Sequence, residues 1–228
     1  MTDVAFVCAM PMEARPLARR LGLSRSSVAG SPGYRGRVGP RGAVVVVTGM
    51  GPRLATAATQ RLLAAVTPAR VIVVGIAGAL VERVPLGTVI VPEVVVDGDT
   101  GDEYRPAAMG GTEARGTLWT SGSLITGPEA LAHLDGQGVI ALDMETAAVA
   151  AVCEAYGTPW SVVRVISDHG ADEQVLRLNH PDGTPDLRAV ARFVVAHPGR
   201  VPALARLGRD ANRAARRAAE VASTAAVG

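Results

Sequence analysis

Short, continuous apolar runs rich in Val alternate along this chain with segments whose apolar residues recur every three or four positions. Continuous apolar runs are typical of strands covered on both faces, as in a parallel sheet, and the periodic segments are typical of helices. Their alternation predicts helices that connect the strands and cover both faces of the sheet. We therefore predict an α/β fold, a three-layer αβα sandwich with a central mixed, mostly parallel sheet, formed by one domain over residues 1–228.

The pattern places the elements along most of the chain. Strands are expected at Val4–Cys8, Ala43–Thr48, Val71–Gly75, Thr88–Val96 with a bend or edge at Pro92, Leu118–Ile125, Val139–Leu142 and Trp160–Ile166. Helices are expected at Met12–Leu21, Leu54–Val66, Met144–Tyr156, Leu187–Ala196 and Val201–Ala222, and a polar loop at Asp97–Gly116.

Composition narrows the class of protein. Apolar residues make up 48% of the 228 residues and aromatic residues only 3%, so the core must be aliphatic. A formal charge of +2 and the lack of a recognition motif argue against a nucleic-acid partner. Cys8 and Cys153 lie in apolar segments, as expected of buried thiols in a reducing cytoplasm, and neither a leader nor a membrane-spanning run is apparent. No zinc or calcium spacing occurs, and we expect no metal or other cofactor.

Three carboxylates stand next to expected strand ends. Glu13 follows the first strand, Glu145 lies in the opening turn of the helix at Met144–Tyr156, and Asp168 follows Ser167 at the end of the last strand. Open α/β sheets bind ligands at the carboxyl ends of their strands. The three positions therefore predict one cleft with acid–base chemistry.

Each of these residues also has an ordinary structural interpretation. Glu13 and Glu145 would favour the start of a helix, and Asp168 would cap the segment after it. Acids at Asp168, Asp172 and Glu173 would raise the pKa of one carboxyl group, as a general acid requires. Arg164 interrupts an apolar strand, and a buried Arg needs an anionic partner, which one of these acids could supply.

Two glycine-containing stretches follow expected strands. Gly49-Met50-Gly51 and Gly75-Ile76-Ala77-Gly78 either let backbone N–H groups approach a ligand or simply form turns. Neither has the G-x-G-x-x-G spacing of a dinucleotide-binding loop.

Six short motifs together resemble the nucleoside phosphorylase/nucleosidase superfamily. The likeness is closest to its hydrolytic members, the 5′-methylthioadenosine/S-adenosylhomocysteine nucleosidases. The motifs are Cys8-Ala9-Met10 with Glu13, Thr48–Gly51, Val74–Leu80, Leu86–Val91, Asp143–Thr146 and Val163–Asp168, in the order of the family.

The resemblance implies a role for each acid. Glu13 is similar to the base that orients the attacking water, Glu145 with Met144 to the ribose-binding pair, and Asp168 to the acid that protonates N7 of the purine, oriented by Ser167. The remaining residues of the predicted substrate site are Gly49, Ile76, Ala77, Gly78, Ile125 and Arg164.

The chain also departs from the family pattern. Ile76 replaces a usual Ser, and Ser123–Thr126 lacks the aromatic residue that usually stacks on the base. Val74 stands where phosphorylases have a phosphate-binding Arg, which favours water over phosphate as the nucleophile.

The run His197–Leu207 resembles the hopanoid-associated phosphorylase-like proteins, which are taken to remove adenine from adenosylhopane. With the short loop Asp97–Gly116, this likeness implies a purine nucleosidase that accepts a bulky, apolar 5′ group. The alternatives are a methylthioadenosine/adenosylhomocysteine or futalosine nucleosidase, and a non-catalytic nucleoside-binding or storage protein. Storage alone would not require Glu13, Glu145 and Asp168 together.

The last helix also bears on partners. Its basic face is either an ordinary solvated surface or a contact with anionic lipid, that is, a peripheral membrane contact. The basic residues are Arg206, Arg209, Arg213, Arg216 and Arg217. The resemblance further implies a homodimer with a small-molecule nucleoside as substrate.

Overall fold

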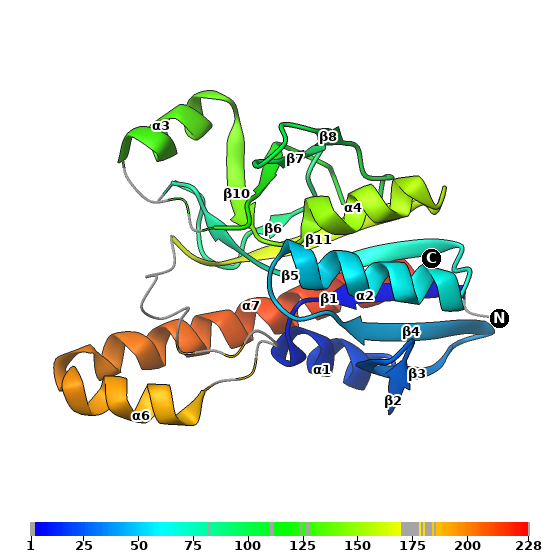
Figure 1. Cartoon of the computed structure of the whole chain (residues 1–228), viewed down its shortest axis with the longest axis horizontal. Helices are drawn as coiled ribbons and strands as arrows, with labels where there is room; N and C mark the ends of the chain where they lie inside the picture. The colour runs from blue at the N-terminus through cyan, green and yellow to red at the C-terminus, as the bar shows by residue number, and fades with distance from the viewer. Residues whose placement is uncertain are drawn as a thin grey trace.

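The computed structural model describes residues 3–81, 83–109, 112–123, 125, 128–169, 178, 180, 184 and 186–227 (Figure 1). The strands are β1 Val4–Cys8, β2 Ser24–Val28, β3 Ser31–Val38, β4 Arg41–Val47, β5 Arg70–Ala79, β6 Val89–Ile90, β7 Val94–Asp97, β8 Glu103–Tyr104, β9 Thr117–Thr120, β10 Val139–Asp143 and β11 Trp160–Asp168. The helices are α1 Pro11–Arg20, α2 Pro52–Ala65, α3 Pro128–Gly136, α4 Thr146–Ala155, α6 Leu187–Ala196, the short 3-10 helix η1 Pro198–Arg200, and α7 Val201–Val227.

The strands form one mixed sheet. Its order is β2-β3-β4-β1-β5-β10-β9-β7-β8, and β11 pairs with β5 and β6. The strands β4, β1, β5 and β11 run parallel, as do β10, β9 and β7, whereas β2–β3–β4, β7–β8 and β6–β11 pair antiparallel. The antiparallel pairing of β10 with β5 joins the two parallel groups.

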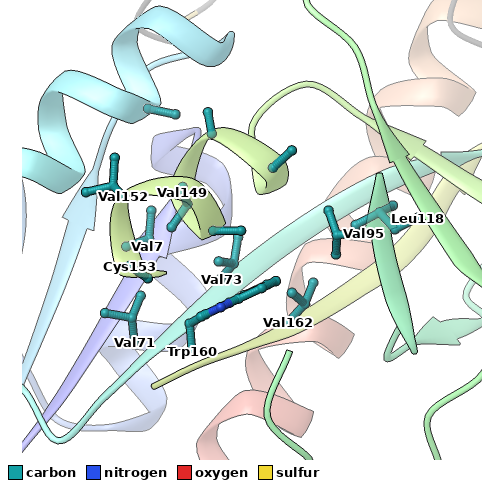
Figure 2. Close-up of a cluster of buried hydrophobic side chains, with 14 of the residues drawn as sticks. Val7, Val71, Val73, Val95, Leu118, Val149, Val152, Cys153, Trp160 and Val162 are labelled. Atoms are coloured by element: carbon teal, nitrogen blue, oxygen red, sulfur yellow. The ribbon is translucent and has the colours of Figure 1, made fainter. Parts of the chain in front are cut away.

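Helices cover both faces of this sheet, as the sequence predicts. Ala5 and Val7 of β1 face a core that includes side chains of α2 and α4, part of which Figure 2 shows. Phe6 and Cys8 face the opposite core, formed with α1 and α7. Successive side chains of a strand point to opposite faces, so one apolar strand contributes to both cores. Cys8 and Cys153 are both buried, without a disulfide, as expected.

Strand β5 differs most from expectation. We predicted that it ends at Gly75 and is followed by a loop, but it continues to Ala79. Its first residues lie between β1 and β11, and its last, Gly78 and Ala79, pair with β10 where β1 has ended. Residues 76–79 therefore remain in the sheet, because β10 takes the place beside β5 that β1 leaves.

Other differences concern weakly patterned segments. The sequence did not predict β2 and β3, which are rich in Ser, Arg and Gly and partly exposed, or the short helix α3. The loop expected at Asp97–Gly116 contains β8, which pairs with β7. Pro92 lies between β6 and β7, so the interruption of the strand expected there, as a bend or an edge, is observed.

The chain ends in two antiparallel helices, α6 and α7, that project from the rest of the molecule (Figure 1). The second half of α7 packs on α1 and the sheet through buried Ala residues, whereas α6 and the start of α7 extend beyond the sheet (Figure 1). We refer to residues 187–209 as the C-terminal hairpin. Within the ranges given above, no helix combines the length and apolar character needed to cross a membrane.

Candidate active site

A cavity of about 500 Å³ lies between the C-terminal ends of β5, β10 and β11 and the C-terminal hairpin. Nine of the eleven predicted site residues line it. They are Glu13, Ile76, Ala77, Gly78, Ile125, Met144, Glu145, Ser167 and Asp168. The other two, Gly49 and Arg164, are not among its lining residues.

Glu13 is the third residue of α1 and is 1% exposed. One carboxylate oxygen accepts the Met10 N–H at 2.8 Å, and the other accepts the Ile76 N–H of β5 at 2.9 Å. Burial raises the pKa of Glu13, although Arg164 and these N–H groups oppose that rise. Glu13 thus caps its helix, as its ordinary interpretation held, and at the same time is anchored over β5 in the cavity.

Gly75 makes room for this arrangement. A Cβ atom there would lie 2.2 Å from an Arg164 guanidinium nitrogen and 2.3 Å from Glu13 Oε1. Both atoms belong to buried, hydrogen-bonded side chains, so neither can easily move. The sequence analysis named Gly75 only as the end of a strand and the start of a glycine-containing motif, and its role as the gap beside these two charges follows from the structure.

Glu145 occupies the N-cap position of α4, but its side chain makes no hydrogen bond to its own helix. Instead, Glu145 Oε1 accepts the Gly51 N–H at 2.7 Å. Gly51 has a φ of +89° directly before Pro52, a conformation that favours glycine. Gly49, which we predicted to offer its N–H to a ligand, donates it to the Ala9 carbonyl at 3.0 Å. Gly51 is therefore the glycine of this loop whose N–H binds a carboxylate of the site.

Arg164 is 1% exposed and lies beside three carboxylates, so the expectation of an anionic partner is confirmed. Its guanidinium nitrogens are 2.5 Å from Asp143 Oδ2, 3.8 Å from Glu145 Oε2 and 3.9 Å from Glu13 Oε1. Burial disfavours the charge of Arg164, but the three carboxylates together raise its pKa.

Asp143 is the site residue that the sequence analysis missed. Its carboxylate accepts the Thr120 hydroxyl at 2.6 Å and both the backbone N–H and hydroxyl of Thr146, besides pairing with Arg164. An acid at a strand end, three residues before a Thr that starts a helix, is the signal that could have revealed it. Asp143 thereby holds Arg164 and the start of α4 together.

Glu145 is also affected by this crowding of charge. Burial and the neighbouring Asp143 raise its pKa to about 8, while Arg164 and the Gly51 N–H act in the opposite direction. Sequence reasoning predicted one carboxyl group with a raised pKa but attributed it to Asp168 and the acids after it. Asp172 and Glu173 lie outside the described residues.

Asp168 ends β11 beside a β-bulge. Ile166 pairs with Ala77 and Asp168 with Gly78, so Ser167 is the additional residue on β11. Bulges redirect side chains and are common beside active sites. The Ser167 hydroxyl lies 2.6 Å from Asp168 Oδ2 and 3.3 Å from the Ala77 carbonyl oxygen. Ser167 therefore links the Asp168 carboxylate to β5.

The outer part of the cavity is aliphatic. Its lining includes Ile125, Leu131 and Leu142, together with Val190 of α6 and Leu204 and Leu207 of α7. Four of the six methionines of the chain also line the cavity, and no Phe, Tyr or Trp is among the described lining residues. The lining methionines are Met10, Met12, Met50 and Met144. Their long, polarizable side chains adapt to ligands of different shape.

Cationic side chains and metal sites are scarce in this cavity. No Arg or Lys is among the described residues that line it. In the same part of the chain, no group of three His, Cys, Asp or Glu side chains could hold a metal ion.

Comparison with known families decides the class. The profile of the phosphorylase superfamily matches residues 3–110 and 107–196. The chain belongs to the phosphorylase superfamily.

Two named nucleosidases are similar to the chain in sequence. A 5′-methylthioadenosine/S-adenosylhomocysteine nucleosidase of Geobacillus kaustophilus is 28% identical over 200 residues, which cover 74% of this chain and 85% of that protein. The enzyme of the same name from Actinobacillus succinogenes is 30% identical over 169 residues, covering 61% and 74%.

Solved structures confirm the superfamily fold. Futalosine hydrolase of Helicobacter pylori superposes with a TM-score of 0.76 at 17% identity, covering 99% of this chain and 97% of that one. The S-adenosylhomocysteine nucleosidase of Streptococcus pyogenes gives a TM-score of 0.75 at 20% identity, covering 99% and 96%. The predicted αβα architecture and superfamily are thus confirmed, whereas the likeness of His197–Leu207 to hopanoid-associated proteins stays a prediction.

Proposed function

We propose that this phosphorylase-superfamily member hydrolyses the N-glycosidic bond of a purine nucleoside. The observation that carries the proposal is the grouping of Glu13, Glu145 and Asp168 at the inner end of one cavity. The names of its relatives, which are nucleosidases, support the same reaction class.

Glu13 and Glu145 act at the sugar. Breaking the N-glycosidic bond develops positive charge on the ribose, and an ionised carboxylate beside that charge, the role proposed for Glu13, stabilises the transition state. Glu13 already accepts two N–H bonds, but a carboxylate has about four acceptor sites, so it can also take a proton from a water molecule. Glu145 binds a ribose hydroxyl, with Met144 packed against the sugar.

Asp168 acts at the base. The departing purine gains electron density, and protonation at N7 neutralises it, a contribution typically worth about 10²–10⁴-fold in rate. Ser167 orients the carboxyl group by its hydrogen bond and its contact with Ala77.

Water, not phosphate, is the proposed nucleophile. A phosphate dianion requires cationic or multiple N–H donors, and the described lining of the cavity contains neither Arg nor Lys. Val74, where phosphorylases have Arg, is completely buried in the core between the sheet, α1 and α7.

The preferred substrate carries a large apolar group at the 5′ position, as in adenosylhopane. The aliphatic outer cavity supports this choice, because buried apolar surface contributes about 25 cal/mol per Å². The second candidate is a 5′-methylthioadenosine/S-adenosylhomocysteine nucleosidase, the activity named for several relatives, or a futalosine hydrolase.

Product analysis tests the proposal. The protein is incubated with adenosine, methylthioadenosine, futalosine and an adenosine bearing a long 5′ alkyl group, with and without phosphate. We expect free base and free ribosyl product in both buffers, with the highest kcat/KM for the alkyl substrate. A ribosyl 1-phosphate that forms only with phosphate would contradict hydrolysis, preference for methylthioadenosine would select the second candidate, and binding without base release would indicate a storage protein.

Two proposals on assembly accompany this function. A homodimer stays a prediction from the family likeness, and light scattering at micromolar concentration measures it. Contact with lipid also stays a prediction from the basic C-terminal helix, and the structure changes which residues would make that contact.

A further inference from the structure

The C-terminal hairpin holds a large share of the positive charge of the protein. Residues 187–209 contain five Arg and neither Asp nor Glu. The rest of the chain has 18 basic and 21 acidic side chains, a formal charge of −3. Charge is therefore strongly asymmetric, and the net positive charge of the chain resides in this hairpin.

The same hairpin exposes large apolar side chains. Leu187 is 76% exposed and Val195 is 82% exposed, the two highest values among the large apolar residues described as exposed. Leu187, Ala191 and Val195 are four residues apart, so they form one stripe along α6. Arg188 and Arg192 follow directly around the helix and border this stripe.

This arrangement suits the surface of an anionic membrane. An interfacial helix buries an apolar stripe at the headgroup boundary while basic side chains beside it reach the lipid phosphates. A different side of α6 faces inward, where half-buried Val190 lines the cavity together with Leu204 and Leu207 of α7. The hairpin that exposes the apolar stripe therefore also forms the aliphatic end of the cavity.

We infer that the C-terminal hairpin docks on an anionic lipid bilayer, so that the cavity receives the apolar part of its substrate from the membrane. The docking stands on the hairpin alone, whereas the delivery of substrate rests on the proposed function. A second copy of the chain is the less suitable occupant, because a two-fold contact through this surface would oppose two hairpins of charge +5.

The sequence analysis grouped three further Arg residues with this basic face, but they lie in a different environment. They are Arg213, Arg216 and Arg217. Their part of α7 is held against the body by the buried residues Ala214 and Ala218, and Arg217 pairs with Glu220. The inferred lipid contact therefore involves α6 and the start of α7, not the whole of the last helix.

Co-sedimentation with vesicles tests the docking. Vesicles of phosphatidylglycerol and phosphatidylcholine are compared with phosphatidylcholine alone in about 100 mM salt, where charges are screened beyond roughly 10 Å. We expect the wild type to bind only the anionic vesicles. Arg188→Gln with Arg192→Gln should lower the partition coefficient by about 30-fold, because each basic side chain near an anionic surface adds about fivefold.

Matched control variants distinguish docking through the hairpin from a general effect of the charge of the protein. Arg25 and Arg35 are exposed on β2 and β3, and their double substitution by Gln should leave vesicle binding within about twofold. Leu187→Glu with Val195→Glu should abolish binding, whereas Leu86→Glu with Tyr156→Glu, also exposed, should not. Equal binding by the hairpin variants and the wild type, or no binding by the wild type, would overturn the inference.

Two further measurements distinguish the other outcomes. The first is the molecular mass in solution, measured by analytical ultracentrifugation. If the hairpin substitutions lower this mass and the wild type does not bind vesicles, a second copy of the chain covers this surface and the inference is wrong. Base release from a water-soluble nucleoside without vesicles should be the same in all these variants. If none of them releases base, the proposed function fails, while the vesicle result still decides the docking.

Discussion

Around the inner end of the cavity, buried charged side chains lie among fixed hydrogen-bond partners, whereas half-buried aliphatic side chains of the C-terminal hairpin form the outer end. The buried charges are those of Glu13, Asp143, Glu145 and Arg164. The inner charges are held by strand ends and helix starts whose positions the sheet determines. The outer side chains belong to helices that extend beyond the sheet (Figure 1). The difference suggests that the inner end determines whether the reaction proceeds, and that the outer end determines which substrates enter.

The largest effect is expected from Asp168→Asn at the inner end. An amide cannot deliver a proton to N7, so kcat should fall by about a hundredfold or more with little change in stability. Base release and thermal unfolding measure the two properties. Asp102→Asn, an exposed carboxylate on a loop, is the control and should keep full activity. Near-normal turnover of a purine nucleoside by Asp168→Asn would contradict the assignment of the acid.

Arg164→Met should weaken the fold itself. It leaves Glu13, Asp143 and Glu145 buried without their counter-ion, and removing one partner of a buried pair typically costs about 3–5 kcal/mol of the free energy of unfolding. Urea denaturation measures the loss.

Gly75→Ala should act in the same direction, because its Cβ meets the Arg164 and Glu13 side chains. Gly136→Ala is its matched control, since a Cβ at that helical glycine meets nothing. Equal stability of the two Ala variants would show that the inner end is less rigid than its contacts indicate.

Glu145 makes stability depend on pH. Its pKa of about 8 in the folded protein lies above its ordinary value near 4.5, so the folded state binds the proton more tightly than the unfolded state. The resulting stabilisation is complete below pH 4.5 and is lost as the pH rises to about 8, by at most about 1.4 kcal/mol per pH unit. Glu145→Gln should flatten this decline in urea denaturation at pH 5, 6.5 and 8. An equally steep decline in the variant would show that Glu145 does not cause it.

The smallest effect is expected at the outer end. Leu207→Ala removes about 40 Å² of apolar surface from the cavity, roughly 1 kcal/mol, so kcat/KM for a nucleoside with a long 5′ alkyl group should fall about fivefold. The kcat/KM for adenosine itself should not change. Leu187→Ala, whose side chain lies outside the cavity, should change neither value in solution. A loss for adenosine as well would mean that the hairpin also positions the inner end.

Prediction from sequence succeeded where the pattern reflects burial on a regular element. Apolar runs located β1, β4, β10 and β11, and the three acids at their ends proved to line one cavity. The extension of β5 was missed because its glycine-containing sequence resembles a turn. Its last residues remain in the sheet because they pair with β10, which the sequence alone does not reveal.

Contacts between distant residues were beyond the reach of the sequence. Asp143 and Gly75 matter through Arg164, which lies 21 residues from the first and much farther from the second along the chain. The hairpin helices were predicted, with α6 at its observed bounds, but periodicity alone does not say that one side lines a cavity and the other is exposed.

Strand β5 links the two carboxyl groups that we propose as catalytic base and acid, Glu13 and Asp168. The Glu13 carboxylate is tied to the N–H of Ile76, and Asp168 is tied through Ser167 to the carbonyl of Ala77, so adjacent residues of one strand hold both. If the sheet bends or twists, we expect this common attachment to carry the two carboxylates in the same direction, so that their separation changes less than the position of either one. Because both groups are attached to one strand, we expect the water-holding Glu13 and the proton-donating Asp168 to keep their relative positions while the rest of the molecule fluctuates.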